Sequence, residues 1–297
     1  MSIKSVAIGM AVCLFTAPSF ANLSTIDAQT NQSIKLAEGF YEDVLVYRNL
    51  NNFGKYVGDT YIQHATAYGD GPAELIKAVA GELTADPGVK VDIYRTIAEG
   101  PYVAIHSVWT TSDGAEYVYV DIWREENGML VEHWDHYQQV PEKSENKNTM
   151  YQGPDANIYD ATQDIERNRG RAIAVLKSFD NPADTSALKK YISSETYIQH
   201  NPEVPNGRKA LVGYLDYLNS NGTKLKTEIA KTIAMGDMVL VHSKQTDLGK
   251  KGDLGVGYID IFRFNSEGKI VEHWDIAETQ TGESANENDV FGYPSQR

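Results

Sequence analysis

The sequence has a single cysteine among its 297 residues, and this residue, Cys13, lies in an apolar run near the N-terminus. The run covers residues 6–17, follows Lys4 and precedes a small-x-small pattern that ends at Ala21. This order is typical of a secretory signal peptide, and the run is shorter than the ~20 apolar residues that span a membrane. We therefore expect residues 1–21 to be a cleaved signal peptide and the protein to be periplasmic or secreted. The mature chain then has no cysteine, which excludes disulfides, a thiolate nucleophile and cysteine-ligated metals.

Basic residues are also scarce, since 27 Lys and Arg stand against 41 Asp and Glu. The formal net charge is −14, and it becomes −15 once Lys4 is removed with the signal peptide. A chain this acidic repels phosphate backbones and anionic lipid heads, so we expect no nucleic acid as a partner and no membrane in the mature form. The hydrophobic share of 41% is ordinary for a globular protein, and the length suggests two domains.

The chain is a tandem duplication. Three patterns recur: TYIQH at 60–64 and 196–200, VEHWD at 131–135 and 271–275, and a tail with two spaced asparagines at 144–154 and 284–294. Repetition over this length indicates two copies of one domain, because the patterns keep their order within each copy. We assign the first domain, with its linker, to residues 30–154 and the second domain to residues 160–294.

Each copy predicts helices followed by strands. Helical spacing of apolar residues covers 34–45 in the first copy, and later helical stretches open at Pro72 and near Gly207. Four strand-like runs follow in each copy: 89–98, 101–110, 116–124 and 129–138, then 225–234, 237–246, 256–264 and 269–277. Helices first and a meander of strands afterwards predict an α+β fold, with helices on one face of a sheet.

The second face of that sheet is also predicted to be covered. Both alternating faces of the run 238–242 carry apolar residues, whereas a sheet with one wet face shows a clean alternation. We expect the sheet of the other repeat to cover this face, so that the repeats pair within the chain as a pseudo-dimer. The alternative is two independent domains joined by the polar connector 141–148.

Histidine supplies the candidate site. Six of the seven histidines form matched pairs: His64 with His200, His106 with His242, and His133 with His273. Histidine titrates near neutral pH and binds metals readily, although a buried structural histidine is the alternative for each one. We expect His106 and Asp121 to lie on neighbouring strands, and His133 and Asp135 to share one strand face, so that each copy points imidazoles and carboxylates into one concavity. The candidate catalytic residues are Asp260, His242, His200 and His273 in the second copy and Asp121, His106, His64 and His133 in the first.

This residue set suits more than one chemistry. An Asp–His pair serves enolisation, aldol-type closure, dehydration or isomerisation, whereas three histidines and a carboxylate equally suit a divalent metal. Neighbouring residues predict the surroundings of the site. Trp134 and Trp274 should pack at the covered sheet face, and Arg124 and Arg263 should form structural ion pairs. Aromatic residues that share a strand face with the two aspartates would line an apolar cavity: Tyr117, Tyr119, Trp123, Tyr258 and Phe262.

Several segments together resemble a known family: YIQHNP at 197–202, the strand that ends at His242, DIFR at 260–263, GKIVEHWD at 268–275 and the pattern Asn286-x-Asn288. They resemble the SnoaL-like, polyketide cyclase-like branch of the nuclear transport factor 2-like superfamily, over nearly all of both copies. The resemblance implies two tandem cone-shaped α+β barrels, each a curved antiparallel sheet wrapped by helices around a pocket. Some members are cofactor-free cyclases that use a pocket Asp assisted by His, and Asp260 and Asp121 match that position.

The first copy departs from the family pattern. It has Ala65 and Thr66 where the second copy has Asn201 and Pro202, which puts the activity of the first copy in doubt. The expected function is a lyase, cyclase or isomerase that acts on a small apolar carbonyl compound without a cofactor. Two alternatives stay open: a non-catalytic binding module for a hydrophobic metabolite, and an enzyme that uses a divalent metal on the three-histidine cluster.

Overall fold

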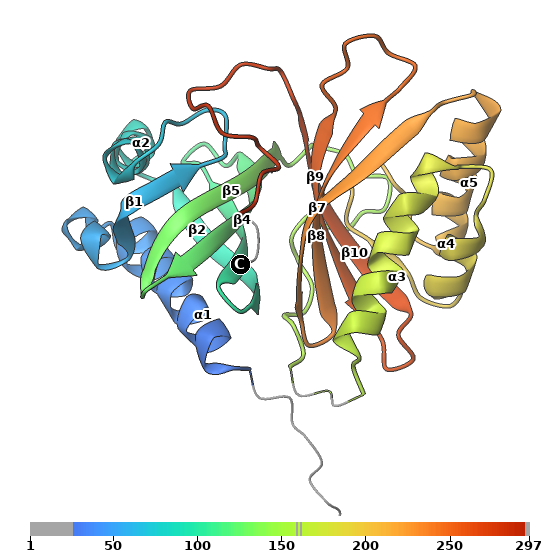
Figure 1. Ribbon diagram of the computed structural model, residues 1–297, viewed down its shortest axis with the longest axis horizontal. Coiled ribbons are helices and arrows are strands. Elements are labelled where there is room, and N and C mark those ends of the chain that lie inside the picture. The colour runs from blue at the N-terminus through green and yellow to red at the C-terminus, as the bar shows by residue number, and fades with distance from the viewer. Residues whose placement is uncertain (1–25, 159, 161, 295–297) are drawn as a thin grey trace, which may run out of the picture.

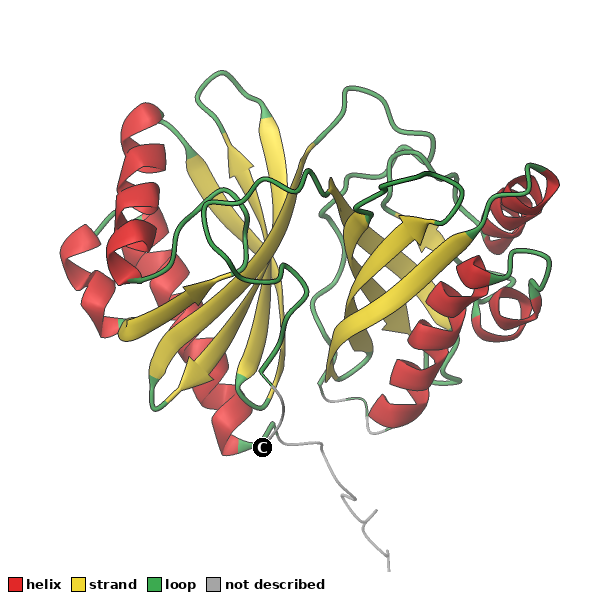
Figure 2. Ribbon diagram, turned by 45° about the horizontal axis from the view of Figure 1, so that its top comes forward, coloured by secondary structure: helices red, strands yellow, loops and turns green. Residues whose placement is uncertain are grey.

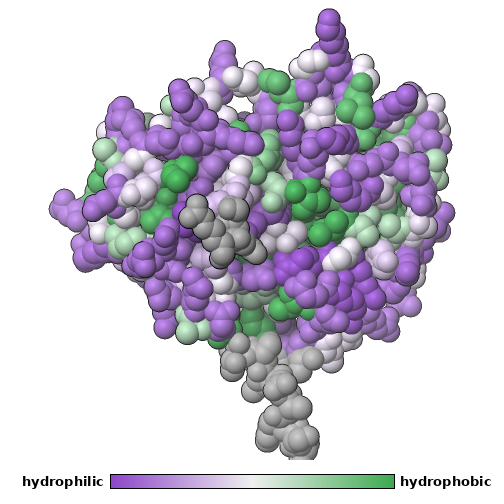
Figure 3. Space-filling view, viewed as in Figure 1, coloured by the Kyte–Doolittle hydropathy of each residue, from purple (hydrophilic) through white to green (hydrophobic). Residues whose placement is uncertain are grey.

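The computed structural model describes residues 26–158, 160 and 162–294, which form two similar units side by side (Figure 1). The signal peptide expected at residues 1–21 lies outside these residues. Within the described part of the chain, no helix has the length and apolar character that crossing a membrane requires. The face of the molecule seen in Figure 3 is largely hydrophilic, with hydrophobic residues in small separate groups.

The first unit begins with helix α1 (Ala28–Phe40), which starts after Asp27 because the Asp27 side chain accepts a hydrogen bond from the Thr30 backbone N–H at 2.8 Å. The elements that follow are a π-helical segment (Tyr41–Val46), a 3₁₀ segment (Leu50–Lys55), β1 (Val57–Gln63), α2 (Pro72–Ala85), β2 (Lys90–Glu99), β3 (Tyr102–Thr110), β4 (Glu116–Glu126) and β5 (Met129–Gln139). Helix α2 opens at Pro72 as expected, because proline suits the first helical position.

The second unit repeats this order with shorter connecting elements. It consists of α3 (Ile165–Lys177), a 3₁₀ segment (Ser178–Asp180), α4 (Ser186–Tyr191), β6 (Ile198–Gln199), α5 (Arg208–Ser220), β7 (Leu225–Met235), β8 (Met238–Asp247), β9 (Val256–Phe264) and β10 (Ile270–Thr279). Helix α5 follows Gly207, whose φ of 91° favours glycine, and Gly71 before α2 has the same φ of 91°. The expected helix starts at Pro72 and near Gly207 are confirmed.

Each unit has one five-stranded sheet, in the order β1-β5-β4-β3-β2 and β6-β10-β9-β8-β7. The four strands expected in each copy form an antiparallel meander, and the predicted α+β class is confirmed. A fifth strand was missed in each copy: β1 runs parallel to β5, and the short β6 runs parallel to β10. The sheets are curved and open, so the expected cones are not closed barrels.

The two sheets face each other at the centre of the molecule, with the helices on the outside (Figure 2). Strand β5 contacts β10 and strand β2 contacts β7 across this interface. Trp134 and Trp274 are each 1% exposed. The Arg95 guanidinium of the first unit lies 4.0 Å from the Trp274 ring centroid, and the Lys231 ammonium of the second unit lies 3.6 Å from the Tyr102 ring centroid. The expected intrachain pseudo-dimer, with the tryptophans at the covered face, is confirmed, and the alternative of two independent domains is wrong.

Candidate active site

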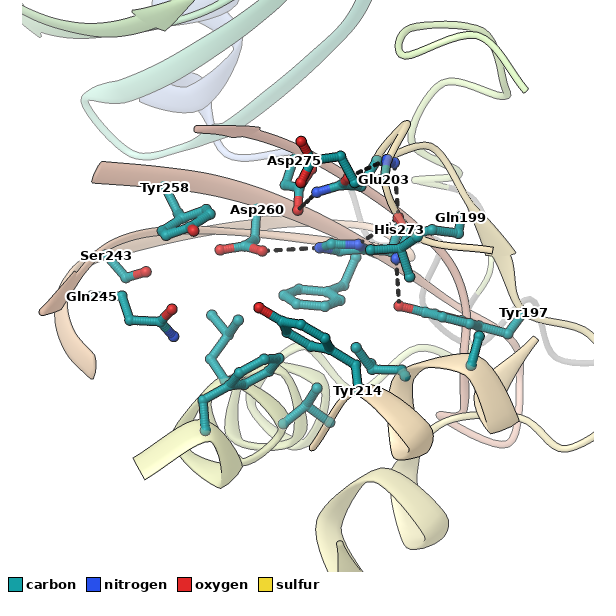
Figure 4. A pocket seen from close by; sticks show the side chains of 18 of the residues that line it. Tyr197, Gln199, Glu203, Tyr214, Ser243, Gln245, Tyr258, Asp260, His273 and Asp275 are labelled. Atoms are coloured by element: carbon teal, nitrogen blue, oxygen red, sulfur yellow. Dashed lines mark hydrogen bonds and ion pairs between the residues drawn. The ribbon is translucent and has the colours of Figure 1, made fainter. Parts of the chain in front are cut away.

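The second unit contains a cavity of about 370 Å³ between its sheet and the helices α3 and α5 (Figure 4). This volume lies within the usual range for small-molecule sites. Apolar residues of α3 and α5 form one wall, and side chains of β8, β9 and β10 form the other. Asp260, Ser243 and Gln245 lie along the sheet, and Tyr214 of α5 lies across the cavity from Asp260. Tyr258 and Phe262 line the cavity, as expected.

A buried acid–base pair lies in this wall. His273 of β10 places its Nε2 2.9 Å from Oδ1 of Asp260 on the neighbouring strand β9, and the two residues are 6% and 3% exposed. The other ring nitrogen of His273, Nδ1, lies 2.9 Å from Oε1 of Gln199. That oxygen also accepts hydrogen bonds from the backbone N–H groups of His200 at 2.9 Å and Asn201 at 3.0 Å, which fixes the orientation of the Gln199 amide.

The amide of Gln199 therefore determines how the imidazole is protonated. Because Oε1 of Gln199 is an acceptor, Nδ1 of His273 carries a hydrogen, and Nε2 is left to interact with Asp260. One proton is then shared between His273 Nε2 and the Asp260 carboxylate. Burial raises the pKa of Asp260 to about 6, against the opposing hydrogen bond from His273. Burial alone would lower the pKa of His273, but the hydrogen bond with Asp260 and the charge of Asp275 raise it above its ordinary value.

The second oxygen of Asp260 makes no hydrogen bond. Oδ2 is buried and has no hydrogen-bond partner among the described residues, and the Asp260 side chain lines the cavity (Figure 4). An unpaired buried carboxylate oxygen is costly, so native proteins keep few of them. Asp275 lies on the same face of the sheet and is 9% exposed, and its Oδ2 accepts a hydrogen bond from the Asn201 side chain at 2.9 Å. Asp260, His273 and Asp275 each offer one ligand atom, and these atoms lie within 4.8 Å of one another.

The first unit keeps the pair but has little space around it. His133 Nε2 lies 3.0 Å from Asp121 Oδ1, and His133 Nδ1 lies 3.1 Å from Gln63 Oε1. Tyr119 and Trp123 line the small cavity beside the pair, as expected, whereas Tyr117 is not part of the lining. The volume is only about 60 Å³, because large side chains occupy the space.

Sequence differences between the copies account for this closure. Trp109 stands in the first unit where the second has Gln245, and Tyr68 donates a hydrogen bond to Glu82 at the cavity wall. Ala65 stands at the position of Asn201, so Asp135 lacks the amide donor that Asp275 has. Burial raises the pKa of Asp135 to about 7.

The remaining candidate histidines lie on the opposite sheet face, towards the other unit. His242 Nε2 lies 3.2 Å from His136 Nε2 of the first unit, and its Nδ1 lies 2.8 Å from the Tyr293 hydroxyl. His200 Nε2 lies 2.9 Å from Glu272 Oε1, and its ring stacks on Trp274 at 4.7 Å. The counterparts in the first unit lie likewise: His64 contacts Glu132 and Trp134, and His106 contacts Arg95.

The expected convergence of three histidines in one concavity is therefore wrong. His106 and Asp121 do lie on neighbouring strands, but the register pairs His106 with Val120 and Asp121 with Ile105. In the second unit His242 likewise pairs with Ile259. Successive side chains of a strand point to opposite faces, so one residue of register separates these histidines from the aspartates. Each unit brings together only one of its three candidate histidines with Asp, and the three-histidine metal cluster does not form.

Two site residues were missed in the sequence, Gln199 and Asn201, although both stand in the quoted motif YIQHNP. The repetition of Gln63 as Gln199 was a usable signal, because both glutamines contact a pocket histidine.

The expected structural role of Arg124 and Arg263 is confirmed. Arg124 and Arg263 form ion pairs of 2.6 Å with Glu132 and Glu272.

The sequence model of the SnoaL-like domain matches residues 37–133 and again residues 174–273. These segments make up more than half of the chain and each lies within one unit. The chain therefore belongs to the SnoaL-like family and carries two tandem copies of its domain. No curated protein is significantly similar to the chain.

Solved structures similar to the chain correspond to about one unit each. TsrD from Streptomyces laurentii is 21% identical and covers 39% of this chain and 91% of its own, with a TM-score of 0.33. A candidate ketosteroid isomerase from Kribbella flavida is 19% identical and covers 44% of this chain and 96% of its own, with a TM-score of 0.34. A candidate polyketide cyclase from Acidithiobacillus ferrooxidans is 16% identical and covers 36% of this chain and 88% of its own, with a TM-score of 0.33.

Proposed function

We propose that the second unit is a cofactor-free lyase, cyclase or isomerase that moves a proton on a small, largely apolar carbonyl compound. The observation that carries this proposal is the buried Asp260–His273 pair, which lines a cavity of about 370 Å³ and keeps one carboxylate oxygen without a hydrogen-bond partner. A general base is effective when its pKa lies near the working pH, and burial raises the pKa of Asp260 to about 6.

Each member of the pair has a separate task. Asp260 Oδ2 removes a proton from the carbon next to the substrate carbonyl, and the electron pair moves onto the carbonyl oxygen as an enolate. His273 stabilises the Asp260 carboxylate through the proton that its Nε2 shares with Oδ1. Gln199 keeps the imidazole ring in the required orientation through Nδ1. Return of the proton at another atom gives isomerisation, and attack of the enolate carbon on a second carbonyl gives ring closure. Loss of a leaving group next to the enolate carbon gives the lyase reaction.

The charge of the cavity wall favours an uncharged substrate. Apart from tyrosines, the ionisable residues that line it are Glu203, Asp260, His273 and Asp275, and neither lysine nor arginine lines this cavity. A substrate with a free carboxylate or phosphate would be repelled by these carboxylates at close range. Aromatic rings of Tyr214 and Phe179 offer flat apolar surface instead. We therefore expect a neutral ketone or aldehyde with an apolar body.

Deuterium exchange tests the proposal without knowledge of the natural substrate. A panel of neutral cyclic and aromatic ketones is incubated with the protein in D₂O, and exchange next to the carbonyl is followed by NMR. Replacing Asp260 by Asn keeps the size of the side chain and removes the base, so exchange should fall by about 10²–10⁴-fold while ketone affinity changes little. The matched substitution Asp121→Asn should cost far less, because the first cavity is nearly filled. Binding of ketones without exchange would favour the binding-module alternative.

A second candidate is a metal-dependent enzyme. The ligand atoms of Asp260, His273 and Asp275 lie within 4.8 Å of one another, a set that suits a divalent cation better than the separated histidines do. The direct hydrogen bond of 2.9 Å between His273 and Asp260 favours the acid–base pair, since a cation would have to replace the shared proton. Metal analysis of the purified protein, with chelator treatment before the exchange assay, distinguishes the two.

We also propose that the protein is exported to the periplasm or secreted. The support is the N-terminal order of Lys4, an apolar run and a small-x-small pattern ending at Ala21.

A further inference from the structure

The linker follows β5 of the first unit and reaches the second unit. There it contacts residues 199–206, which form the cavity loop. Asn148 of this linker donates hydrogen bonds from Nδ2 to the backbone oxygen of Gln199 at 2.9 Å and to Oδ1 of Asn206 at 3.0 Å. The same Oδ1 of Asn206 accepts the backbone N–H of Gln199 at 2.8 Å. Asn148 and Asn206 thus bind both backbone polar groups of Gln199.

A second linker asparagine binds the middle of the same loop. Asn146 is 7% exposed, and its Nδ2 donates to the backbone oxygens of Asn201 at 2.5 Å and Val204 at 2.9 Å. The backbone N–H of Glu145 donates to the oxygen of Pro202 at 2.8 Å. Three residues of the linker, Glu145, Asn146 and Asn148, therefore bind a loop that belongs to the other unit.

This loop carries the side chains that orient the acid–base groups. Gln199 Oε1 faces Nδ1 of His273, and Asn201 Nδ2 donates to Asp275. The sheet pairs with this loop only through the two residues of β6, Ile198 and Gln199, which lie opposite Glu272 and His273. Backbone groups at a short sheet edge need other partners, and here the linker provides them.

The C-terminal tail repeats the arrangement in the opposite direction. Asn288 donates to the backbone oxygen of Gln63 and to Oδ1 of Asp70, each at 2.8 Å. Asn286 donates to the oxygens of Ala65 and Tyr68, each at 2.8 Å. Figure 1 shows this tail, in red, lying over the first unit. The chain therefore contains a matched control for any experiment on the linker.

We infer that the linker of the first unit is part of the active site of the second unit, and that Asn146 and Asn148 are positioning residues that act on His273 and Asp275 through Gln199 and Asn201. The inference rests on the proposed function of the second cavity. Each unit is then incomplete without the segment that follows the sheet of the other unit. This explains why the spaced asparagines recur after both sheets of the duplicated sequence.

Histidine NMR tests the inference directly on the full chain. In protein labelled with ¹⁵N-histidine, the double variant Asn146→Ala/Asn148→Ala should alter the ring resonances of His273 and leave those of His133 in place. Loss of a well-placed Gln199 acceptor destabilises the imidazolium, so the pKa of His273 should fall by about one unit, a ten-fold change in proton affinity. The control Asn286→Ala/Asn288→Ala should show the reverse selectivity, with changes at His133 only.

Unchanged His273 resonances in the folded linker variant, or equal changes at both histidines in both variants, would overturn the inference. If the double variant does not fold, Asn148→Asp and its control Asn288→Asp replace it, because each keeps the side-chain size and loses the donor. Asn148→Asp should then change the resonances of His273 only, and Asn288→Asp those of His133 only. The readout needs no turnover, so a wild-type protein that catalyses no exchange would count against the proposed function and not against the role of the linker.

Discussion

Replacing Ala65 by Asn should restore to the first unit the hydrogen bond that the second unit makes between Asn201 and Asp275. The backbone is already in place for it. Ala65 N–H donates to Gln63 Oε1 at 2.9 Å, just as Asn201 N–H donates to Gln199 Oε1 at 3.0 Å. The new amide should therefore reach the Asp135 carboxylate.

The magnitude follows from the carboxylate that the amide would meet. A hydrogen bond to a charged group contributes about 1.5–3 kcal/mol, and each pKa unit corresponds to about 1.4 kcal/mol. Burial raises the pKa of Asp135 to about 7, so the Ala65→Asn variant should lower it by about 1–2 units. A carboxyl-carbon NMR titration of labelled aspartate measures this change.

The Ala65→Asn variant should differ in stability from the unmodified protein only at pH values where Asp135 is ionised. Because its pKa in the folded protein lies above the ~3.9 of an unfolded chain, the folded protein holds a proton that the unfolded chain has released between these pH values. Raising the pH across this window therefore lowers the free energy of unfolding of the unmodified protein. The variant lowers the folded-state pKa of Asp135 and so narrows this pH window. Urea denaturation should therefore show a free energy of unfolding that is larger by about 1.5–3 kcal/mol above pH ~7 and almost unchanged near pH ~4.

Ala65→Leu is the control, since leucine has a similar size and no donor. Equal titration of Asp135 in the Asn and Leu variants would refute the reasoning. So would a stability gain of the same size at both pH values, because that gain would come from packing and not from ionisation.

Three further predictions concern processing, assembly and pH. Mass spectrometry of exported protein should find a mature N-terminus near Asn22, and recovery of intact Met1 from the membrane fraction would contradict export. A variant that ends near Asn157 should dimerise or aggregate, because it exposes the sheet face that the second unit covers; a monomer that stays soluble in ultracentrifugation would argue that this face tolerates water. Ketone exchange should rise about ten-fold per pH unit below pH ~6 and level off above it, as Asp260 loses its proton, and a flat profile would exclude Asp260 as the base.

The sequence by itself determined the architecture, because the signals for it are local. Repeated motifs revealed the two copies, and period-two runs located eight strands within a few residues of their ends. The apolar character of both faces of residues 238–242 predicted that the sheets pair, and the alternation along VEHWD placed Trp134 and Trp274 at the covered face. The parallel strands β1 and β6 were missed, since β6 has only two residues and its partner is distant in the chain.

Only the tertiary structure decided which candidate residues meet. His242 and Asp260 lie on neighbouring strands, yet a difference of one residue in register places them on opposite faces, and register depends on how the strands pair across their turns. Cavity volume is equally non-local. The Asp–His pair recurs in both copies, but it adjoins about 370 Å³ in the second unit and about 60 Å³ in the first, because side chains from separate helices and strands fill the space in one unit and not in the other.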